Sequence, residues 1–264
     1  MAQQTGCPAT LADYVAEYKL REAQTSLREF FRQSWPVLEP QTQCIPNWHI
    51  ECIAEHLEAV SAGEIRRLII NIPPRMTKSL LVSVAWPCWE WIEAPAQRWI
   101  FCSYAGSLST MHSLVRRNLI ASPWYQERWG RRVRLKADQN QKSEFENTAS
   151  GRMTATSITG ATTGKGGNRL VLDDPQDPRQ AASDLERQAA IDFYTGTLST
   201  RLDDRRRGAI VLIMQRLHEQ DLTGYILSTE TGWTHLSLPM RAEKRTEVSY
   251  PRSGRTKMRQ AGEL

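Results

Sequence analysis

The segment from Arg66 to Trp91 constrains the fold more than any other part of the sequence. It opens with the apolar, β-branched run 68–72, which is typical of a buried parallel strand. Pro73 and Pro74 cannot continue a strand or a helix, so the chain must turn there. Apolar residues then recur at helical spacing from Leu80 to Trp91. A strand, a tight loop and a helix in this order predict an α/β domain with a mainly parallel sheet flanked by helices.

Lys78 and Ser79 stand where this helix begins. In a phosphate-binding loop the backbone N–H groups and the helix N-terminus face the anion, the lysine reaches the β- and γ-phosphates, and the serine hydroxyl ligates Mg²⁺. The pattern G-x-x-x-x-G-K-[ST] would place glycine at positions 72 and 77, where this chain has Ile72 and Thr77. Thr77 must then adopt a backbone conformation that suits glycine. The alternative is an ordinary strand–turn–helix with a solvated lysine.

A second motif follows further along the chain. Leu170-Val171-Leu172 leads into Asp173-Asp174-Pro175, a Walker B pattern of apolar residues followed by acids at a strand end. We expect Asp173 to hold Mg²⁺ across from Ser79, and Asp174 to orient and deprotonate a water molecule. Asp-Asp-Pro alone is also a common turn. Its position after a phosphate loop, within alternating strands and helices, favours the ATPase interpretation.

The rest of the chain supports one α/β core. The 264 residues are 40 % hydrophobic, without an apolar run long enough to span a membrane, and the five cysteines are scattered and expected to be reduced. Helices are predicted from Thr10 to Trp35-Pro36 and from Trp48 to Val60. The run 208–214 is the most apolar strand and is therefore expected to be central. Further strands are expected at 97–103, around Phe145, at 153–158 and at 234–238, and further helices at 107–120 and 181–200.

Together the motifs resemble the large terminase subunits of tailed bacteriophages, whose deviant Walker A often reads Pro-Pro-Arg-x-Gly-Lys-Ser. The segment Pro73 to Ser79 is similar, as are the Walker B strand and the run Gln215 to Gly224. The resemblance covers roughly residues 30 to 240. It implies an ASCE-type P-loop NTPase core that binds ATP and Mg²⁺. The nucleotide would be held by the loop residues Pro74, Arg75, Met76, Thr77, Lys78, Ser79 and Leu80.

The resemblance also assigns individual roles. Gln215 would sense the γ-phosphate from the end of its strand. Lys165 or Arg169 would act as an arginine-finger-type residue, a basic side chain that reaches a neighbouring subunit's γ-phosphate and stabilises the charge that develops there. Arg75 is the competing finger, which would act in cis on the nucleotide of its own subunit. The sequence does not decide between them. Near the N-terminus, Gln43, Trp48 and His49 would contact adenine, with ordinary helix packing as the alternative.

The implied function is the packaging of double-stranded DNA into a procapsid, in the host cytoplasm and without a membrane. The partners would be the portal protein and the small terminase subunit, and the working form a homo-oligomeric ring, although the isolated domain is expected to be monomeric. The basic segment 128–136 would contact DNA phosphates, or it is a solvated face. The implied layout is a helical lead (1–40), the ATPase domain (41–240) and a basic linker (241–264) toward a nuclease domain outside this chain.

Two other functions are compatible with the motifs. One is a different nucleic-acid motor such as a helicase, which usually adds a second RecA-like domain. The other is a non-hydrolysing, nucleotide-dependent DNA clamp or assembly module, for which Thr77 and Asp174 would be signs of a decayed site.

Overall fold

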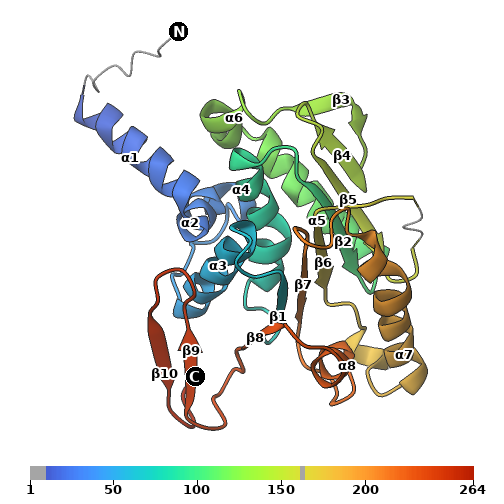
Figure 1. Cartoon of the computed structure of the whole chain (residues 1–264). Coiled ribbons are helices and arrows are strands. Elements are labelled where there is room, and N and C mark those ends of the chain that lie inside the picture. Colours follow the sequence, from blue (N-terminus) through green and yellow to red (C-terminus); the bar gives the residue numbers. More distant parts are fainter. Residues whose placement is uncertain (1–9, 161–163) are drawn as a thin grey trace.

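The computed structural model describes residues 10–160 and 164–264, and its centre is an eight-stranded sheet in the order β3-β4-β5-β2-β6-β7-β1-β8 (Figure 1). The six strands from β5 to β8 pair in parallel, and β3 and β4 are antiparallel at one edge. This confirms the predicted mainly parallel α/β core. The strands are β1 (Arg67–Asn71), β2 (Arg98–Ser103), β3 (Leu135–Asn140), β4 (Glu144–Asn147), β5 (Arg152–Ser157), β6 (Arg169–Asp173), β7 (Ala209–Met214) and β8 (Thr234–Ser237).

Helices cover both faces of the sheet (Figure 1). They are α1 (Leu11–Thr25), α2 (Leu27–Leu38), α3 (Trp48–Ser61), the π-helical turn η1 (Leu80–Ala85), α4 (Trp86–Glu93), α5 (Gly106–Ala121), α6 (Pro123–Trp129), η2 (Pro178–Gln180), α7 (Asp184–Asp192), η3 (Phe193–Thr197), η4 (Leu198–Arg201) and α8 (Leu222–Thr229). Among the described residues, no helix combines the length and the apolar character that a membrane span requires.

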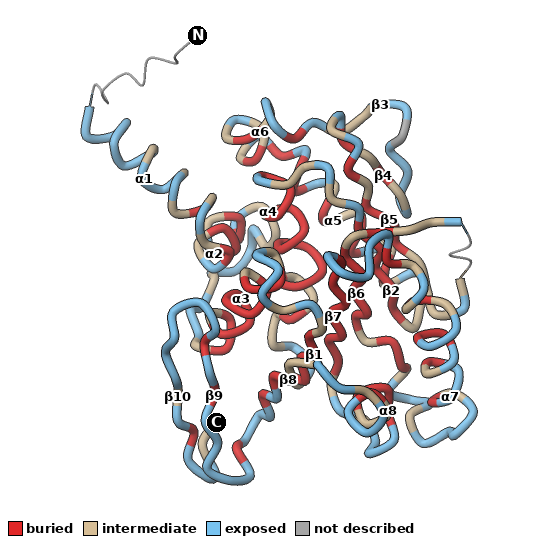
Figure 2. The backbone as a smooth tube through the Cα atoms, viewed as in Figure 1, coloured by how far each residue is buried: buried red, intermediate tan, exposed pale blue. Residues whose placement is uncertain are grey.

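Alternate residues of each central strand enter two separate cores. Leu68 and Ile70 of β1 pack with α2 to α5, whereas Ile69 packs on the opposite face with residues of η3, η4 and α8. This is the period-2 alternation of a strand with both faces covered. Figure 2 shows the result as a buried sheet between partly exposed helices.

The order of the central strands determines where the functional motifs meet. β7 lies between β6 and β1, as its uninterrupted apolar sequence predicted, and all six of its residues are buried. Because β1, β7 and β6 run parallel, their carboxyl ends lie at one edge of the sheet. Those ends lead into the predicted phosphate-binding loop, Gln215 and the Asp173–Asp174 pair.

The N-terminal prediction needs two corrections. α2 continues through Pro36 to Leu38 and does not stop at Trp35-Pro36. Pro36 falls in the last turn, so the hydrogen bond it cannot donate is lost near the helix end. α2 also buries Leu27, Phe30 and Phe31 in the same core as α3 and α4, so this half of the expected 1–40 lead packs as part of the domain.

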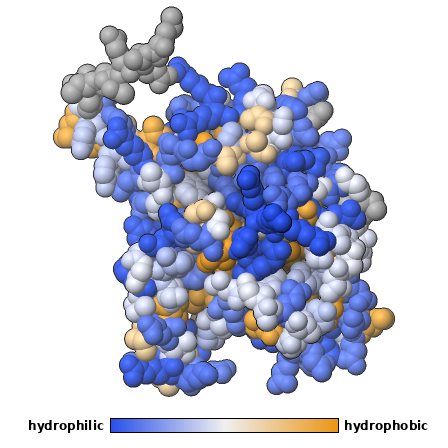
Figure 3. Space-filling view, in the orientation of Figure 1, coloured by the Kyte–Doolittle hydropathy of each residue, from blue (hydrophilic) through white to orange (hydrophobic). Residues whose placement is uncertain are grey.

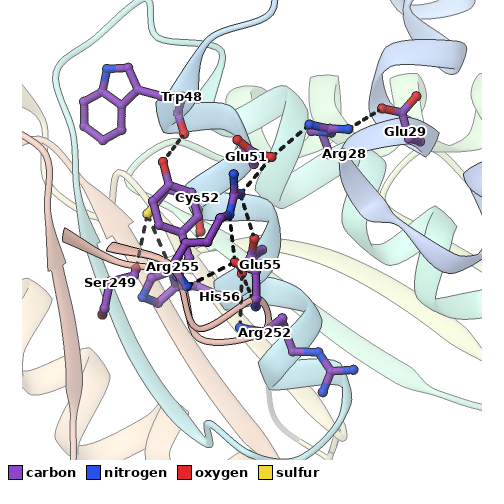
Figure 4. A network of polar contacts seen from close by, with 12 residues as sticks. Arg28, Glu29, Trp48, Glu51, Cys52, Glu55, His56, Ser249, Arg252 and Arg255 are labelled. Carbon is purple, nitrogen blue, oxygen red and sulfur yellow. Dashed lines mark hydrogen bonds and ion pairs between the residues drawn. The ribbon is translucent and has the colours of Figure 1, made fainter. Parts of the chain in front are cut away.

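The C-terminal segment 241–264, expected from the sequence to be a basic linker with little structure, is folded. It forms the hairpin β9 (Thr246–Ser249) and β10 (Thr256–Arg259), which packs on α3 (Figure 4). Glu55 accepts hydrogen bonds from the backbone N–H groups of Arg252 and Ser253, at 3.1 and 2.8 Å, and Arg255 lies 2.9 Å from Glu51. The sequence prediction missed the hairpin because acids on α3, nearly 200 residues away, hold it.

Candidate nucleotide-binding site

The loop between β1 and η1, the predicted phosphate-binding loop, holds two residues other than glycine in the left-handed backbone conformation. Arg75 and Thr77 have φ values of 63° and 56°. Thr77 therefore adopts the left-handed conformation that the sequence predicted for it. Such a conformation costs a residue with a Cβ about 1–2 kcal/mol. The N–H of Leu81 donates to the Thr77 carbonyl at 3.1 Å, which joins the loop to the helical turn behind it.

We therefore expect Thr77→Gly to raise the free energy of unfolding by roughly 1 kcal/mol, the left-handed strain less the greater flexibility of glycine in the unfolded chain. Urea denaturation measures this change. Thr77→Ala is the matched control, because it removes the same hydroxyl but keeps the Cβ and the strain. If the glycine variant is no more stable than the alanine variant, Thr77 carries no strain.

Lys78 and Asp174 form a close ion pair at the centre of the site. Both carboxylate oxygens of Asp174 lie 2.6 Å from the Lys78 Nζ, and the lysine is buried. Asp174 itself has a φ of 46°, so its position at the end of β6 is also strained. The pair brings the predicted phosphate ligand and the predicted general base into contact. A phosphate oxygen that entered the loop would compete with Asp174 for the same ammonium group.

Asp173 is buried and held by two serines from the turn after the loop. Its Oδ1 accepts from the Ser79 hydroxyl at 3.0 Å, and its Oδ2 accepts from the Ser83 hydroxyl at 2.6 Å. The Ser79 hydroxyl and the Asp173 carboxylate thus face each other, as the sequence predicted. Mg²⁺ prefers such hard oxygen donors and retains several waters and substrate phosphates, so this pair fits the ion.

Sequence reasoning missed a second layer behind Asp173. His112 and Arg116, one turn apart on α5, are both buried, and the His112 Nδ1 lies 3.5 Å from the Asp173 Oδ2. Arg116 donates to the Ser83 carbonyl, and its guanidinium lies 3.6 Å from the centre of the Phe101 ring. The i, i+4 spacing of these two polar residues on one helix face is the one signal in the sequence for this layer.

The burial of the two carboxylates alters their acidity. Burial raises the pKa of Asp173, and hydrogen bonds from Ser83 and Ser79 with the charge of Lys78 oppose that rise. Burial also raises the pKa of Asp174, and the charge of Asp173 adds to the effect. A raised pKa makes Asp174 a stronger proton acceptor than a free aspartate. Burial lowers the pKa of His112 to about 4, so this ring is neutral at pH 7.

Gln215 follows β7 and lies next to the same pair. Its backbone N–H donates to the Asp174 Oδ1 at 3.3 Å, and its side chain is half-buried. The neighbouring Arg216 bonds instead to Asp221, the N-cap of α8, at 2.9 Å. Gln215 is therefore placed at the carboxyl end of a central strand, where its assigned role as a γ-phosphate sensor requires it to be.

The three finger candidates lie in different places. Arg75 is exposed in the phosphate-binding loop itself. Lys165 is partly exposed and bonds to Glu144 at 2.7 Å. Arg169 begins β6, four residues and about 13 Å along the strand from Asp173, and it is buried against Glu90 at 2.7 Å. A buried, paired arginine at the far edge of the sheet does not suit a finger that reaches another subunit, so Arg169 is removed from the candidates.

The predicted adenine contacts also separate. His49 is buried near the loop, where the Met76 backbone opposes the lowering of its pKa by burial. Trp48 instead contacts the hairpin, with Lys257 and Arg259 each 5.2 Å from its ring. It also lines a cavity of about 450 Å³ between α2 and α3. Gln43 is exposed in the loop before α3. His49 thus interacts with the predicted phosphate-binding loop through Met76.

The sheet order, with the loop after β1 beside the acids after β6, is that of an α/β domain with the P-loop ATPase fold. The crystal structure of the HK97 bacteriophage large terminase has this fold: it superposes with a TM-score of 0.57 over 87 % of the chain, at 14 % identity. The fold is thus that of a phage large terminase, as the sequence resemblance implied. The chain spans about half (46 %) of that protein.

Two further terminase structures are less similar. The ATPase domain of the Thermus phage P74-26 large terminase gives a TM-score of 0.46 at 12 % identity over 79 % of this chain and 84 % of that one. The large terminase of a thermophilic bacteriophage gives 0.44 at 11 % over 78 % and 45 %. No family model and no curated protein matches the sequence.

Proposed function

We propose that this chain hydrolyses Mg-ATP to drive double-stranded DNA into a phage procapsid, as the ATPase part of a large terminase. The observation that carries the proposal is the constellation of Lys78, Ser79, Asp173 and Asp174 at the carboxyl edge of the sheet. The fold shared with the HK97 protein supports it. The working form would be a ring docked on the portal, with the small terminase subunit as a further partner.

The residues suggest how the reaction proceeds. Lys78 turns from Asp174 to the β- and γ-phosphates, and the freed Asp174 carboxylate then orients and deprotonates the attacking water. Ser79 and Asp173 would hold Mg²⁺, which neutralises charge on the phosphate oxygens when it is bound. Ser83, His112 and Arg116 keep Asp173 in place from behind. Arg75, an exposed cation in the same loop, would counter the charge that develops on the γ-phosphate.

The test is phosphate release from Mg-ATP, with and without linear duplex DNA. We expect turnover by the parent chain, and a loss of about 10²-fold or more in Lys78→Ala, because a buried charge that stabilises the transition state is gone. Lys142→Ala is the matched control, because Lys142 is an exposed lysine remote in sequence from both motifs. A parent chain that binds ATP without turnover, even as an assembled ring, would favour the non-hydrolysing clamp.

A further inference from the structure

The amino-terminal ends of the parallel strands, opposite the nucleotide site, carry a row of arginines. Five adjacent parallel strands, β5, β2, β6, β7 and β1, begin at or just after an arginine. In that order the residues are Arg152, Arg98, Arg169, Arg207 and Arg67. At a strand spacing of about 4.8 Å the row extends over roughly 19 Å. Sequence order hides this row, because its members come from separate stretches of the chain.

The loop that leads into β7 widens the row into a patch. Arg205, Arg206 and Arg207 are exposed there, and Arg66 donates to the Arg206 carbonyl at 2.7 Å. In Figure 3 the most hydrophilic side chains gather near the middle of the visible face, over the region where β6 and β7 begin. We define the edge patch as the exposed and half-exposed arginines Arg66, Arg67, Arg98, Arg152, Arg201, Arg205, Arg206 and Arg207.

Little negative charge compensates the edge patch. Asp203 pairs with Arg98 at 3.3 Å and Asp204 with Arg207 at 4.0 Å. Arg67 and Arg152 donate to backbone carbonyls, and their charges are partly compensated at longer range by Glu230 and Glu144 respectively. Eight arginines against two aspartates leave an excess of six charges, although the whole chain has a net charge of only +5. Counting Glu230 and Glu144 as well as the two aspartates still leaves an excess of four positive charges.

The segment 128–136 is a weaker candidate for a polyanion surface than its sequence predicted. Arg132 pairs with Glu93 at 3.0 Å and Lys136 with Glu146 at 2.8 Å. Arg128 lies over the Trp124 ring and donates to the Trp124 carbonyl. Two of its five cations are therefore paired with carboxylates, against two of the eight arginines in the edge patch.

We propose that the edge patch binds the phosphate backbone of duplex DNA. Guanidinium groups match phosphate oxygens in geometry and charge, and contacts to the backbone carry no sequence preference. A single strand is disfavoured, because single-strand sites use aromatic platforms and none of the exposed large apolar side chains of the described residues belongs to the patch. The choice of DNA rests on the proposed function; the surface itself lies a full strand length from the nucleotide site.

The test compares two triple variants that remove equal charge. Arg205→Gln/Arg206→Gln/Arg207→Gln alters the edge patch, and Arg128→Gln/Arg131→Gln/Arg134→Gln is the matched control in the segment 128–136. Binding of a labelled linear duplex is measured by fluorescence anisotropy over a range of salt concentrations. If each arginine of the patch contacts one phosphate, affinity falls on the order of 10²-fold at 0.1 M salt, and the slope of log K against log salt decreases by about 2.7. The control should lose only a few-fold.

Several outcomes would overturn the proposal: parental affinity in the edge-patch variant, equal losses in the two variants, or a parent chain that does not bind duplex DNA. Urea unfolding of both variants checks that they are folded. Failure of the proposed function is read separately, from ATP turnover without DNA, which the edge-patch variant should retain at the parental rate. A chain that binds DNA through the patch without hydrolysing ATP would refute the motor and leave the DNA surface intact.

Discussion

An Arg75→Ala chain is expected to turn ATP over about 10³-fold more slowly than the parent, because arginine fingers contribute 10³–10⁵ to turnover. Arg75 is exposed in the predicted phosphate-binding loop, three residues before Lys78. Its φ of 63° lies in the left-handed region, so the loop constrains its backbone. Alanine keeps the Cβ and therefore the same backbone strain. The loss would then come from the missing guanidinium and not from a relaxed loop.

Mixing experiments distinguish a finger in cis from one in trans. Arg75→Ala mixed with Lys78→Ala should stay inactive in every ratio, because both residues act on the same nucleotide. Lys165→Ala is the comparison, since Lys165 lies beyond the loop in a surface pair with Glu144. We expect it to retain most of its activity. Loss of activity in Lys165→Ala that the Lys78→Ala subunit restores would instead assign the finger to Lys165 of a neighbouring subunit.

The local sequence was sufficient to predict those features that the central sheet itself stabilises. The strand 208–214 could be placed at the centre because six consecutive apolar residues must be buried on both faces. Thr77 could be assigned a left-handed backbone because the loop shape requires one there. Ser79 could be predicted to face Asp173 because β1, which precedes the loop, and β6 end on the same side of the sheet.

The sequence failed where the partner is remote or where strand length decides the outcome. Nothing in the residues around Ser253 indicates that Glu55 will bind its backbone. The layer behind Asp173 consists of His112 and Arg116, which reach the site only because α5 packs against η1. Neither sequence motif includes residues of α5. The resemblance assigns Arg169 a reach to a neighbouring subunit's γ-phosphate, yet its side chain is buried against Glu90, a partner on α4 that the local sequence does not reveal. β3, α6 and α8 were not predicted.

The corrected role of Arg169 leads to the largest expected change in stability. Its Nε and Nη2 lie within 3.2 Å of the Glu90 carboxylate, and both side chains are only 5 % exposed. Removing one member of a buried pair leaves the other charge uncompensated, which costs about 3–5 kcal/mol. We expect Arg169→Ala to lower the free energy of unfolding by that amount, measured by urea denaturation at pH 7.

The pH dependence identifies the cause of this loss. Burial raises the pKa of Glu90, and Arg169 opposes the rise. Without Arg169 the folded-state pKa of Glu90 rises further above its unfolded value. In this variant the neutral Glu90 carboxyl is tolerated in the folded protein at low pH. The free energy of unfolding then falls as the pH increases through the raised pKa of Glu90 and the carboxyl becomes charged. The deficit of Arg169→Ala should therefore shrink as the medium is acidified.

The double variant Glu90→Leu/Arg169→Met completes the argument, because it replaces the whole pair with apolar side chains of similar size. Such replacements of buried pairs are often neutral or stabilising, so its stability should lie within about 1 kcal/mol of the parent. If Arg169 were a finger, the result would be the reverse: Arg169→Ala would have parental stability at every pH, and only its turnover would fall. Normal ATP turnover in the folded double variant would confirm that Arg169 contributes to the fold and not to the chemistry.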